Sequence, residues 1–358
     1  SRTPPRPLPD PSPGAPLARS RSLSAVFASG AVVVLTGTFK MVSLDHGFVL
    51  DPALLDTNKD LTDEELQTLR ADIEAVFKPS ADPTDLPKDL RLVAEKELNE
   101  LPERLKSNIK ELKQLIEGEK GLKAKTDDLF LAAFLRGRKH DVGKAFQCLK
   151  NFYDFKSRYP DLYKFLYPSV NPEVYGQNHF GNIATRDKKG RKICFLIPYR
   201  INIDEIPMVQ NFKMGTSMLE MMLNDLTLQV IGTVIIFDMR NLSLLMQARM
   251  ATPTLAWHLC MVVQDKIPMR LKAVHIVNQP FYFNACYALF KPLLKKKIRK
   301  RVFMHGTDYS SLHKHIDPEE LPVEYGGTQP PFSSRLTTTL LHLNESKFKE
   351  WEKYGYDK

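Results

Sequence analysis

The sequence predicts an α/β protein in which an N-terminal bundle of helices precedes a mainly parallel sheet. Two observations lead to this prediction. From about residue 61 to residue 159, apolar side chains recur every three or four residues, as on one face of a helix. From about residue 193, four short runs rich in β-branched and aromatic residues alternate with helix-length segments. We expect a helical domain at residues 41–165, an α/β domain at 166–330, and a linker with a final helix at 331–358.

Residues 1–40 differ in composition from the rest and are left out of this fold. They begin with "SRTPPRPLPDPSPGAPLARSRS", which is too rich in Pro, Arg and Ser to bury an apolar core, so we expect disorder. An apolar run, "AVFASGAVVVLTGTF", then leads to Met41. Two interpretations stay open. The segment is either a targeting leader, which is typically Arg-rich and poor in acidic residues, or an extension that precedes a true start at Met41.

Local signals define the helices of the bundle. Thr62 and Glu65 have the spacing of a capping box at the start of a helix. Pro102 lies within a long helical pattern and predicts a break or kink there. Two further helices are expected on either side of "GRKH", with Thr126 and Asp141 as their N-caps.

The α/β part is predicted from four runs that we expect to be strands: "KICFLIPY", "TVIIFDM", "LKAVHIVN" and "KRVFMHG". Helix-length segments at residues 209–230, 251–264 and 280–300 lie between them. Alternation of this kind predicts parallel strands joined by crossover helices. "DPEELPVEYGG" closes the unit, and "NESKFKEWEKYG" is expected to form the last helix after a polar linker.

Charge is distributed unevenly along the chain. Residues 41–128 carry 13 basic and 21 acidic side chains, a net charge of −8, whereas residues 129–358 carry 33 and 20, a net charge of +13. With the +4 of residues 1–40, these values give the total of +9. We therefore expect only the C-terminal part to meet an anionic partner.

The cysteines and the hydropathy indicate the compartment. Cys148, Cys194, Cys260 and Cys286 are widely spaced and form no CxxC pair. This pattern favours packed thiols in a reducing compartment over a disulfide framework or a zinc site. No apolar run approaches the roughly 18 residues of a spanning helix. We expect a soluble, cytoplasmic protein.

The motifs that would indicate an enzyme are missing from the sequence. No GxGxxG follows a strand, and neither GxxxxGK[ST] nor GxSxG occurs. We therefore expect no catalysis and no cofactor. His305, His313 and His315 lie close together, but surface or capping roles are commoner for such histidines than metal binding. Asp238, at the end of a predicted strand, is expected to be structural.

Residues 280–301 combine a long apolar stretch with a cationic end. On a helix that starts near Pro280, one stripe is apolar for three turns and cationic for the last; its members are Phe283, Tyr287, Phe290, Leu294, Lys297 and Arg301. One interpretation is a buried core helix with a solvated end. The other, which we favour, is a lid whose apolar side chains cover a cavity or enter a bilayer while its cations hold headgroups. Nucleic-acid binding fits less well, because no aromatic stacking platforms interrupt the basic run.

Several stretches resemble the CRAL-TRIO family of lipid-transfer proteins. "FLRGRKHDVGKAFQCLKNFYDFKSRYP" is similar to the family's N-terminal helical signature. "VIIFDM", "IPMRLKAVHIVNQPFYFNACYALFKPLLKKKIRKRVFMHG" and "SLHKHIDPEELPVEYGG" are similar to its lipid-binding domain. The resemblance extends over residues 126–327 and leans towards the branch of alpha-tocopherol transfer protein, cellular retinaldehyde-binding protein and clavesin. It implies a sheet that forms the floor of a bowl, closed by a mobile helix at residues 280–300 over one hydrophobic ligand.

The resemblance also implies two sets of site residues. The tocopherol-transfer branch holds phosphoinositides in a basic cleft, and its positions fall here on Arg138, Arg270, Lys272, Lys297 and Arg301. The residues implied to line the ligand cavity are Phe195, Phe212, Leu219, Leu259, Val262, Val263, Ile267, Val274, Phe281 and Phe283. Gly215 and Leu219 stand where that branch has small polar residues, so a tocopherol-type hydroxyl contact is in doubt.

The expected function is that of a lipid-transfer protein with one tocopherol-, retinoid- or phospholipid-like ligand. It would dock reversibly on endosomal or other phosphoinositide-containing membranes, as a monomer and without a nucleic-acid partner. An alternative stays open, namely a membrane-trafficking adaptor that binds phosphoinositide through the same cleft and carries no apolar cargo. The sequence does not identify the ligand, because an apolar cavity accepts many shapes.

Overall fold

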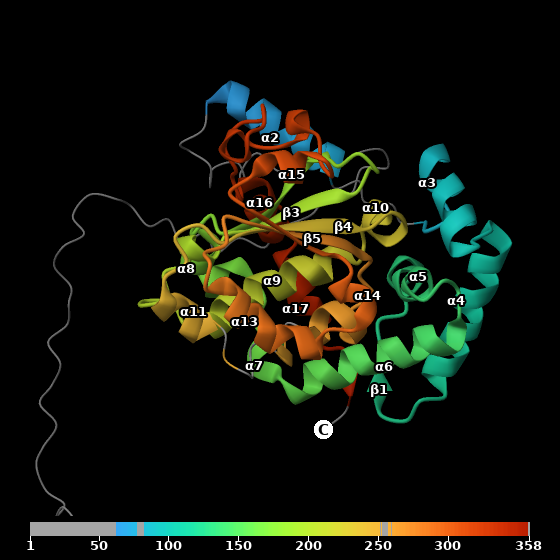
Figure 1. The fold of residues 1–358 in the computed structure, drawn as a ribbon. Coiled ribbons are helices and arrows are strands. Elements are labelled where there is room, and N and C mark those ends of the chain that lie inside the picture. Colours follow the sequence, from blue (N-terminus) through green and yellow to red (C-terminus); the bar gives the residue numbers. More distant parts are fainter. Residues whose placement is uncertain (1–61, 77–81, 251, 253–256, 259, 357–358) are drawn as a thin grey trace, which may run out of the picture. The chain divides into compact units, whose positions relative to one another are not determined.

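A computed structural model describes most of the chain after residue 61 (Figure 1). The described residues are 62–76, 82–250, 252, 257–258 and 260–356. They lie within one compact unit. The segment expected to be a leader or an extension, residues 1–40, lies outside them. Among the described helices, none has the length and apolar character needed to cross a lipid bilayer.

The first part of the described chain is helical. Its helices are α2 (Asp63–Val76), α3 (Lys88–Val93), α4 (Pro102–Glu117), α5 (Asp128–Gly137), α6 (Val142–Arg158) and α7 (Pro160–Tyr163), with a π-helical turn at Ala94–Leu98. The predicted capping box is confirmed: the Glu65 amide donates to Thr62 Oγ1 at 3.2 Å, and the Thr62 amide donates to Glu65 Oε2 at 2.8 Å. The predicted break is confirmed too, since α4 begins at Pro102 shortly after Asn99, which has a left-handed backbone.

One of the two predicted N-caps is correct. The carboxylate of Asp141 accepts a hydrogen bond from the Lys144 amide at 2.9 Å at the start of α6. The prediction of Thr126 for α5 is wrong, because the N-cap is Asp127, whose side chain accepts from the Phe130 amide at 3.0 Å. A carboxylate at this position also interacts favourably with the positive end of the helix, which a threonine hydroxyl does not.

A five-stranded sheet forms the centre of the α/β part. Its strands are β2 (Phe180–Arg186), β3 (Lys192–Leu196), β4 (Thr233–Asp238), β5 (Leu271–Val277) and β6 (Val302–Gly306), in that spatial order. The four predicted strands are β3 to β6, and they pair in parallel as expected. The antiparallel edge strand β2 was not predicted, because "FGNIATR" contains glycine, asparagine and no clear alternation.

Helices cover both sides of this sheet. The described helices of this part are α8 (Pro172–Tyr175), α9 (Met208–Met222), α10 (Leu226–Val230), α11 (Leu244–Met250), α13 (Phe283–Phe290), α14 (Lys296–Arg299), α15 (Tyr309–His313), α16 (Arg335–Leu343) and α17 (Glu345–Trp351). The helical segment predicted at 209–230 is confirmed as α9 and α10, and the one predicted at 251–264 lies partly outside the described residues. A small antiparallel pair, β1 (Leu122–Lys123) with β7 (Gly355–Tyr356), joins the helical part to the C-terminal end.

Two predicted segments differ from the structure. Residues 280–301 do not form one helix: α13 ends at Phe290, a 3-10 turn follows, and Leu294 is extended before α14 begins. Pro292 explains the interruption, because it lacks an amide donor and its ring disfavours a continuing helix. Residues 335–343, expected as part of a linker, form α16, in which Leu336 and Leu340 are buried one turn apart.

The two faces of the sheet pack against different neighbours, as the alternation of strand side chains requires. We call one the α15 face; its core residues include Ile193, Phe195, Val234, Ile236, Ala273 and Val277. The other is the α13 face, formed by Cys194, Leu196, Ile235, Phe237, Val274 and Ile276. In Figure 1, α15 lies above the sheet, and α9 and α13 lie below it.

Candidate functional site

The helix α13 packs on the α13 face of the sheet. A cluster of buried apolar side chains, here called the lid cluster, joins α13 to β5 and to the segment after β4: Met239, Leu242, Met246, Ile276 and Phe283. Phe283 is only 6% exposed, and the hydroxyl of the preceding Tyr282 donates a hydrogen bond to the Leu242 carbonyl. The helix is therefore held mainly by apolar contacts on its inner side.

The outer side of α13 and the neighbouring helix α11 expose large apolar side chains. Phe281, two residues before α13, is 91% exposed, and Leu289 of α13 is 58% exposed; in α11, Leu244 is 65% and Leu245 is 58% exposed. Large exposed apolar side chains, where they form a patch, are typical of a surface that contacts a membrane or another protein. The helix is thus apolar on both sides.

The five cationic positions implied by the resemblance lie near one another, and we call them the basic cluster: Arg138, Arg270, Lys272, Lys297 and Arg301. Partial burial lowers the pKa of the Lys297 ammonium, and positive neighbours lower it further; these neighbours are Arg301, Lys139, Arg270 and Arg138. Burial also lowers the pKa of Lys272, and the charge of Arg270 lowers it further. Cations that destabilise one another in this way form a site suited to an anionic ligand.

Lys139 belongs to this site but was not predicted. It follows Arg138 in "GRKH", where Lys139 and His140 both have a positive φ, 54° and 61°. These two left-handed residues turn the chain sharply between α5 and α6. The signal available in the sequence was the neighbouring lysine itself, in a short loop between two helices.

Two glycines permit the close approach that assembles the basic cluster. A Cβ on Gly137 would lie 3.0 Å from the Pro268 carbonyl oxygen, so this glycine lets the end of α5 approach the segment before β5. Gly232 has a φ of +99°, and a Cβ there would overlap the Arg270 carbonyl oxygen. The absence of both side chains therefore brings Arg138 and Arg270 towards the same place.

Backbone groups and one carboxylate orient the cations. Arg270 donates through Nη1 to the Val230 carbonyl at 2.5 Å, and Arg301 donates to the Leu271 carbonyl. Glu97, from the π-helical turn before α4, lies between two members of the basic cluster. Its Oε2 is 2.7 Å from Arg270 Nη2 and 3.0 Å from Lys272 Nζ.

Comparison with known proteins identifies the family. Residues 177–327 match the family model described as the CRAL/TRIO domain. The chain is 33% identical over 264 residues to "Alpha-tocopherol transfer protein-like" from Homo sapiens, covering 74% of this chain and 77% of that protein. It is 33% identical over 265 residues to "Clavesin-2" from Homo sapiens, covering 73% and 80%. The chain belongs to the CRAL-TRIO family. Membership confirms the resemblance and places the chain among lipid-binding and lipid-transfer proteins.

A solved structure is also similar. The "Crystal structure of Sfh5" matches with a TM-score of 0.43 and 16% identity, covering 75% of this chain and 99% of that chain.

The residues that the CRAL-TRIO resemblance implies for a ligand cavity lie in several places. Val274 and Phe283 pack together between the sheet and α13. Four others pack with the core of α5 and α6: Phe212, Leu219, Val262 and Ile267. Phe281 points away from the core and is exposed. Leu259 and the side chain of Val263 lie outside what the structure describes.

The remaining member of that set, Phe195, lies on the opposite face of the sheet. It is fully buried on the α15 face, with its ring centroid 4.9 Å from that of Tyr325 and 5.0 Å from that of Phe332. Its neighbours Cys194 and Leu196 point towards the α13 face instead, because successive strand side chains alternate. Phe195 therefore lies away from α13 and packs in a separate core.

Several residues close to α13 were not predicted. They are Ile203, Phe237, Met239, Met246 and Ile276. A signal for some of them was present, since in "VIIFDM" every second residue faces the same side of the sheet. Ile276 lies two residues after Val274 on the same strand, so alternation would have selected it. The parallel register would then have selected Phe237, its partner on the neighbouring strand.

Asp238 has the structural position expected of it. It is fully buried, and its Oδ1 accepts from the Arg240 amide at 2.9 Å and from Asn278 Nδ2 at 2.8 Å. Its Oδ2 accepts from the Tyr325 hydroxyl at 3.0 Å. The carboxylate therefore fixes the turn after β4 and ties it to the segment that closes the α15 face.

The histidines take part in local hydrogen bonds. His305 Nδ1 lies 2.7 Å from Ser311 Oγ, and His305 Nε2 lies 3.0 Å from His275 Nδ1. His313 Nε2 donates to the Tyr325 carbonyl at 3.0 Å. Within the described part of the chain, no three His, Cys, Asp or Glu side chains are grouped in a way that could hold a metal ion.

Proposed function

We propose that the chain carries one hydrophobic ligand between α13 and the α13 face of the sheet, and that the basic cluster docks it on phosphoinositide-containing membranes. The observation that carries this proposal is the two-sided apolar character of α13. On the inner side Phe283 packs in the lid cluster, and on the outer side Leu289 is exposed. Such a helix can exchange contact with the sheet for contact with a ligand or a bilayer.

Burial of the ligand would supply the affinity. Covering roughly 500 Å² of apolar surface contributes on the order of 12 kcal/mol before the costs of ordering are subtracted. A bilayer offers the ligand a similar gain, so the protein cannot release or collect it unless α13 moves. The lid cluster and the hydrogen bond from Tyr282 are the contacts that such a movement would break.

The basic cluster would couple docking to that movement. Lys297 lies in α14, which follows α13 after a short turn, so a force on α14 acts on the end of the lid. Each Lys or Arg close to an anionic leaflet contributes about 1 kcal/mol, and several together support reversible docking. Headgroup contact at Lys297 and Arg301 would favour the open form, provided that these two cations bind headgroups more tightly in the open form than in the closed form. The membranes concerned would be endosomal or other phosphoinositide-containing membranes that face the cytoplasm.

An adaptor without apolar cargo is the second candidate. It is favoured by the direct packing of Phe283 in the lid cluster, which covers the α13 face with the protein's own side chains. In that case phosphoinositide would be the only lipid that the protein retains.

Mass spectrometry of retained lipid distinguishes the two candidates. The full chain is incubated with a total tissue lipid extract, re-isolated, and its bound lipids are extracted and identified. One enriched hydrophobic compound at near-equal stoichiometry is the result that the carrier predicts. Phosphoinositide as the sole retained lipid would contradict the carrier and support the adaptor.

Transfer between liposomes tests the docking. Lys297→Gln should lower the rate of ligand transfer to phosphoinositide-containing vesicles about fivefold, the effect of roughly 1 kcal/mol at one headgroup contact. Lys353→Gln is the matched control, since Lys353 is an exposed lysine after α17 whose charged neighbour is Glu350. Equal rates for the two variants would refute docking through the basic cluster.

A further inference from the structure

Glu97 lies between two cations of the basic cluster. Its carboxylate bridges Arg270 and Lys272 at the distances given above, and these two side chains are only 11% and 19% exposed. The Glu97 side chain itself is 47% exposed. A carboxylate oxygen between an arginine and a lysine makes the same charge-assisted hydrogen bonds that a phosphate oxygen would make.

The carboxylate is charged at neutral pH. Partial burial opposes its ionisation, but the hydrogen bond and charge of Lys272, together with those of Arg270, outweigh burial and lower the pKa of Glu97 below its usual range. The two cations are therefore neutralised in part by the chain itself. Any anionic ligand must compete with this carboxylate.

The backbone around Glu97 is firmly anchored. In the π-helical turn Ala94–Leu98, both end residues are 1% exposed and pack with Val230 of α10. The turn ends at Asn99, whose left-handed backbone redirects the chain. Glu97 is thus presented from a fixed turn and differs in this respect from an ordinary surface carboxylate.

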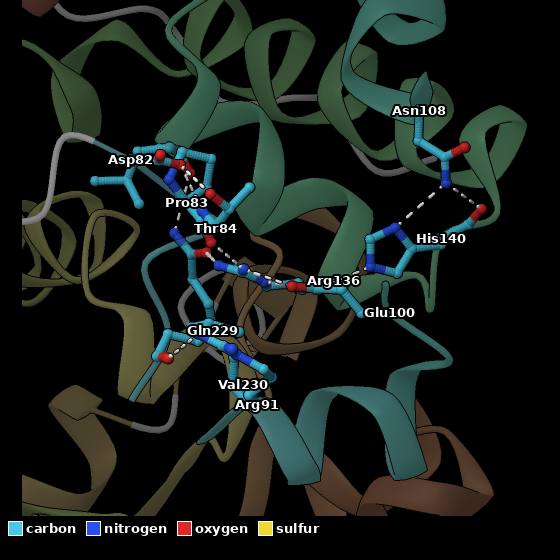
Figure 2. Close-up of polar contacts among 12 residues, drawn as sticks. Asp82, Pro83, Thr84, Arg91, Glu100, Asn108, Arg136, His140, Gln229 and Val230 are labelled. Carbon is cyan, nitrogen blue, oxygen red and sulfur yellow. Dashed lines mark hydrogen bonds and ion pairs between the residues drawn. The ribbon is translucent and has the colours of Figure 1, made fainter. Parts of the chain in front are cut away.

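Three residues after Glu97, a buried network of polar side chains around Glu100, here called the polar node, holds the chain (Figure 2). Glu100 is paired with Arg136, which donates to it through Nε at 2.9 Å and Nη2 at 2.7 Å. Arg136 also donates through Nη1 to Gln229 Oε1 at 2.6 Å, and His140 Nε2 lies 2.9 Å from Glu100 Oε2. Asn108 Nδ2 lies 3.2 Å from His140 Nδ1 and donates to the His140 carbonyl at 3.3 Å.

This node connects the turn that carries Glu97 to the elements that carry the cations. Arg136 lies two residues before Arg138 at the end of α5. Gln229 precedes Val230, whose carbonyl accepts the hydrogen bond from Arg270. One network of hydrogen bonds therefore sets the positions of both Glu97 and the basic cluster. Their proximity is a consequence of the fold.

We propose that Glu97 is a built-in competitor in the basic cluster: its carboxylate competes with lipid headgroups for Arg270 and Lys272 and weakens the binding of all of them, so that only headgroups that bind strongly, such as those that bear a phosphomonoester, displace it. A phosphomonoester carries a charge of about −1.5 to −2 at neutral pH and three acceptor oxygens. A phosphodiester carries a single charge, as Glu97 does, and gains little by the exchange. The inference rests on the proposed docking and names what the docking surface selects.

Moving the Glu97 carboxylate away from Arg270 and Lys272 costs the protein little free energy. The carboxylate is about half exposed, so it regains water when it leaves the cations. Arg270 and Lys272 keep a charged partner throughout, and no buried cation is left unpaired. The difference in charge between the two competing anions therefore decides which one binds.

Removal of the Glu97 charge tests this inference. Binding of the full chain and of Glu97→Gln is measured by flotation with phosphatidylcholine vesicles that contain either phosphatidylserine or a phosphatidylinositol bisphosphate, at equal total lipid charge. We expect affinity for both kinds of vesicle to rise about tenfold, because removing the competing charge restores one charge contact of roughly 1.4 kcal/mol to either headgroup. Phosphatidylserine vesicles that the unaltered chain leaves unbound at a given lipid concentration should then be bound.

Glu95→Gln is the matched control, because Glu95 is exposed in the same π-helical turn and its neutralisation changes the net charge equally. An equal gain in both variants would show a general effect of net charge and overturn the inference. If Glu97→Gln leaves both affinities unchanged while Lys297→Gln weakens bisphosphate binding, the docking stands and the role of Glu97 fails. If the unaltered chain shows no preference for the bisphosphate, the proposed docking fails, and the inference fails with it.

Discussion

Phe195 and Phe283 are both buried phenylalanines of the α/β part, but they lie on opposite faces of the sheet and in different surroundings. Phe195 is packed against Tyr325 and Phe332 from the segment that closes the α15 face. Phe283 reaches the α13 face from a helix whose outer side is exposed. Phe195 therefore belongs to a tightly packed core, here called the fixed wall, whereas Phe283 belongs to a helix that covers the sheet.

The polar contacts explain this difference. On the α15 face, a fully buried Asp238 accepts hydrogen bonds from Arg240, Asn278 and Tyr325, and separating these partners would leave a buried charge unsatisfied. On the α13 face, α13 is held by apolar contacts and by the hydrogen bond from Tyr282. Apolar contacts can be exchanged for a ligand or for a bilayer without loss of hydrogen bonds. The α13 face has fewer polar ties, so under the proposed function it is the face that would open.

Truncation on the α15 face should have the largest effect. Phe195→Ala should lower the free energy of unfolding by about 4 kcal/mol, because it leaves a cavity in a core that cannot relax. Urea denaturation followed by circular dichroism measures this loss. A loss below about 1 kcal/mol would contradict the description of this face as a fixed wall.

Acid should weaken the same face through His275. This residue is fully buried beside His305, and burial, followed by the neighbouring histidines, lowers its pKa to about 3. A base whose pKa is lower in the folded than in the unfolded state loses stability as pH falls below the unfolded value of about 6.5. We expect the free energy of unfolding to fall by about 2 kcal/mol between pH 7.5 and 5 from this group. In His275→Gln the fall measured by urea denaturation should be smaller by that amount, and an unchanged fall would exclude this origin.

Truncation under α13 should cost less stability than truncation of Phe195. Phe283→Ala should lower the free energy of unfolding by less than about 2 kcal/mol, since the loss cannot exceed the free energy with which α13 stays closed. Ligand retention, measured on lipid-loaded protein by mass spectrometry, should fall about tenfold in the same variant. A loss of stability equal to that of Phe195→Ala would remove the distinction between the two faces.

Substitution on the outer side of α13 should have the smallest effect on stability. Leu289 is 58% exposed, so Leu289→Ser should change the free energy of unfolding by less than about 0.5 kcal/mol. It should nevertheless slow ligand transfer to vesicles about threefold, because less apolar surface enters the bilayer. Unchanged transfer would mean that this side of the helix does not meet the membrane.

Features that depend on neighbouring residues were predicted well from the sequence. The capping box of Thr62 and Glu65, the break at Pro102 and the N-cap Asp141 each depend on a few adjacent side chains. The four parallel strands have a clear composition and were also found. The interruption after α13 was available in the sequence as Pro292, but the long apolar run around it was read as continuous.

Two features that depend on distant residues were not predicted. The face on which Phe195 lies requires the register between β3 and β4, where Phe195 is the partner of Ile236. Glu97 lies in the acidic region, which was not expected to meet an anionic partner, and it is separated from Arg270 by 173 residues. Only the fold brings this carboxylate to the basic cluster, so the sequence alone gave no reason to select it.

Hydrogen exchange compares the two faces in one molecule and tests the central claim, that α13 is a lid which membranes help to open. Amide exchange is followed by mass spectrometry for peptides covering α13 and β4, with and without phosphatidylinositol bisphosphate vesicles. We expect α13 to exchange faster than β4 in solution and about tenfold faster still when vesicles are added, while β4 stays unchanged. Equal protection of α13 and β4, unaffected by vesicles, would contradict the account.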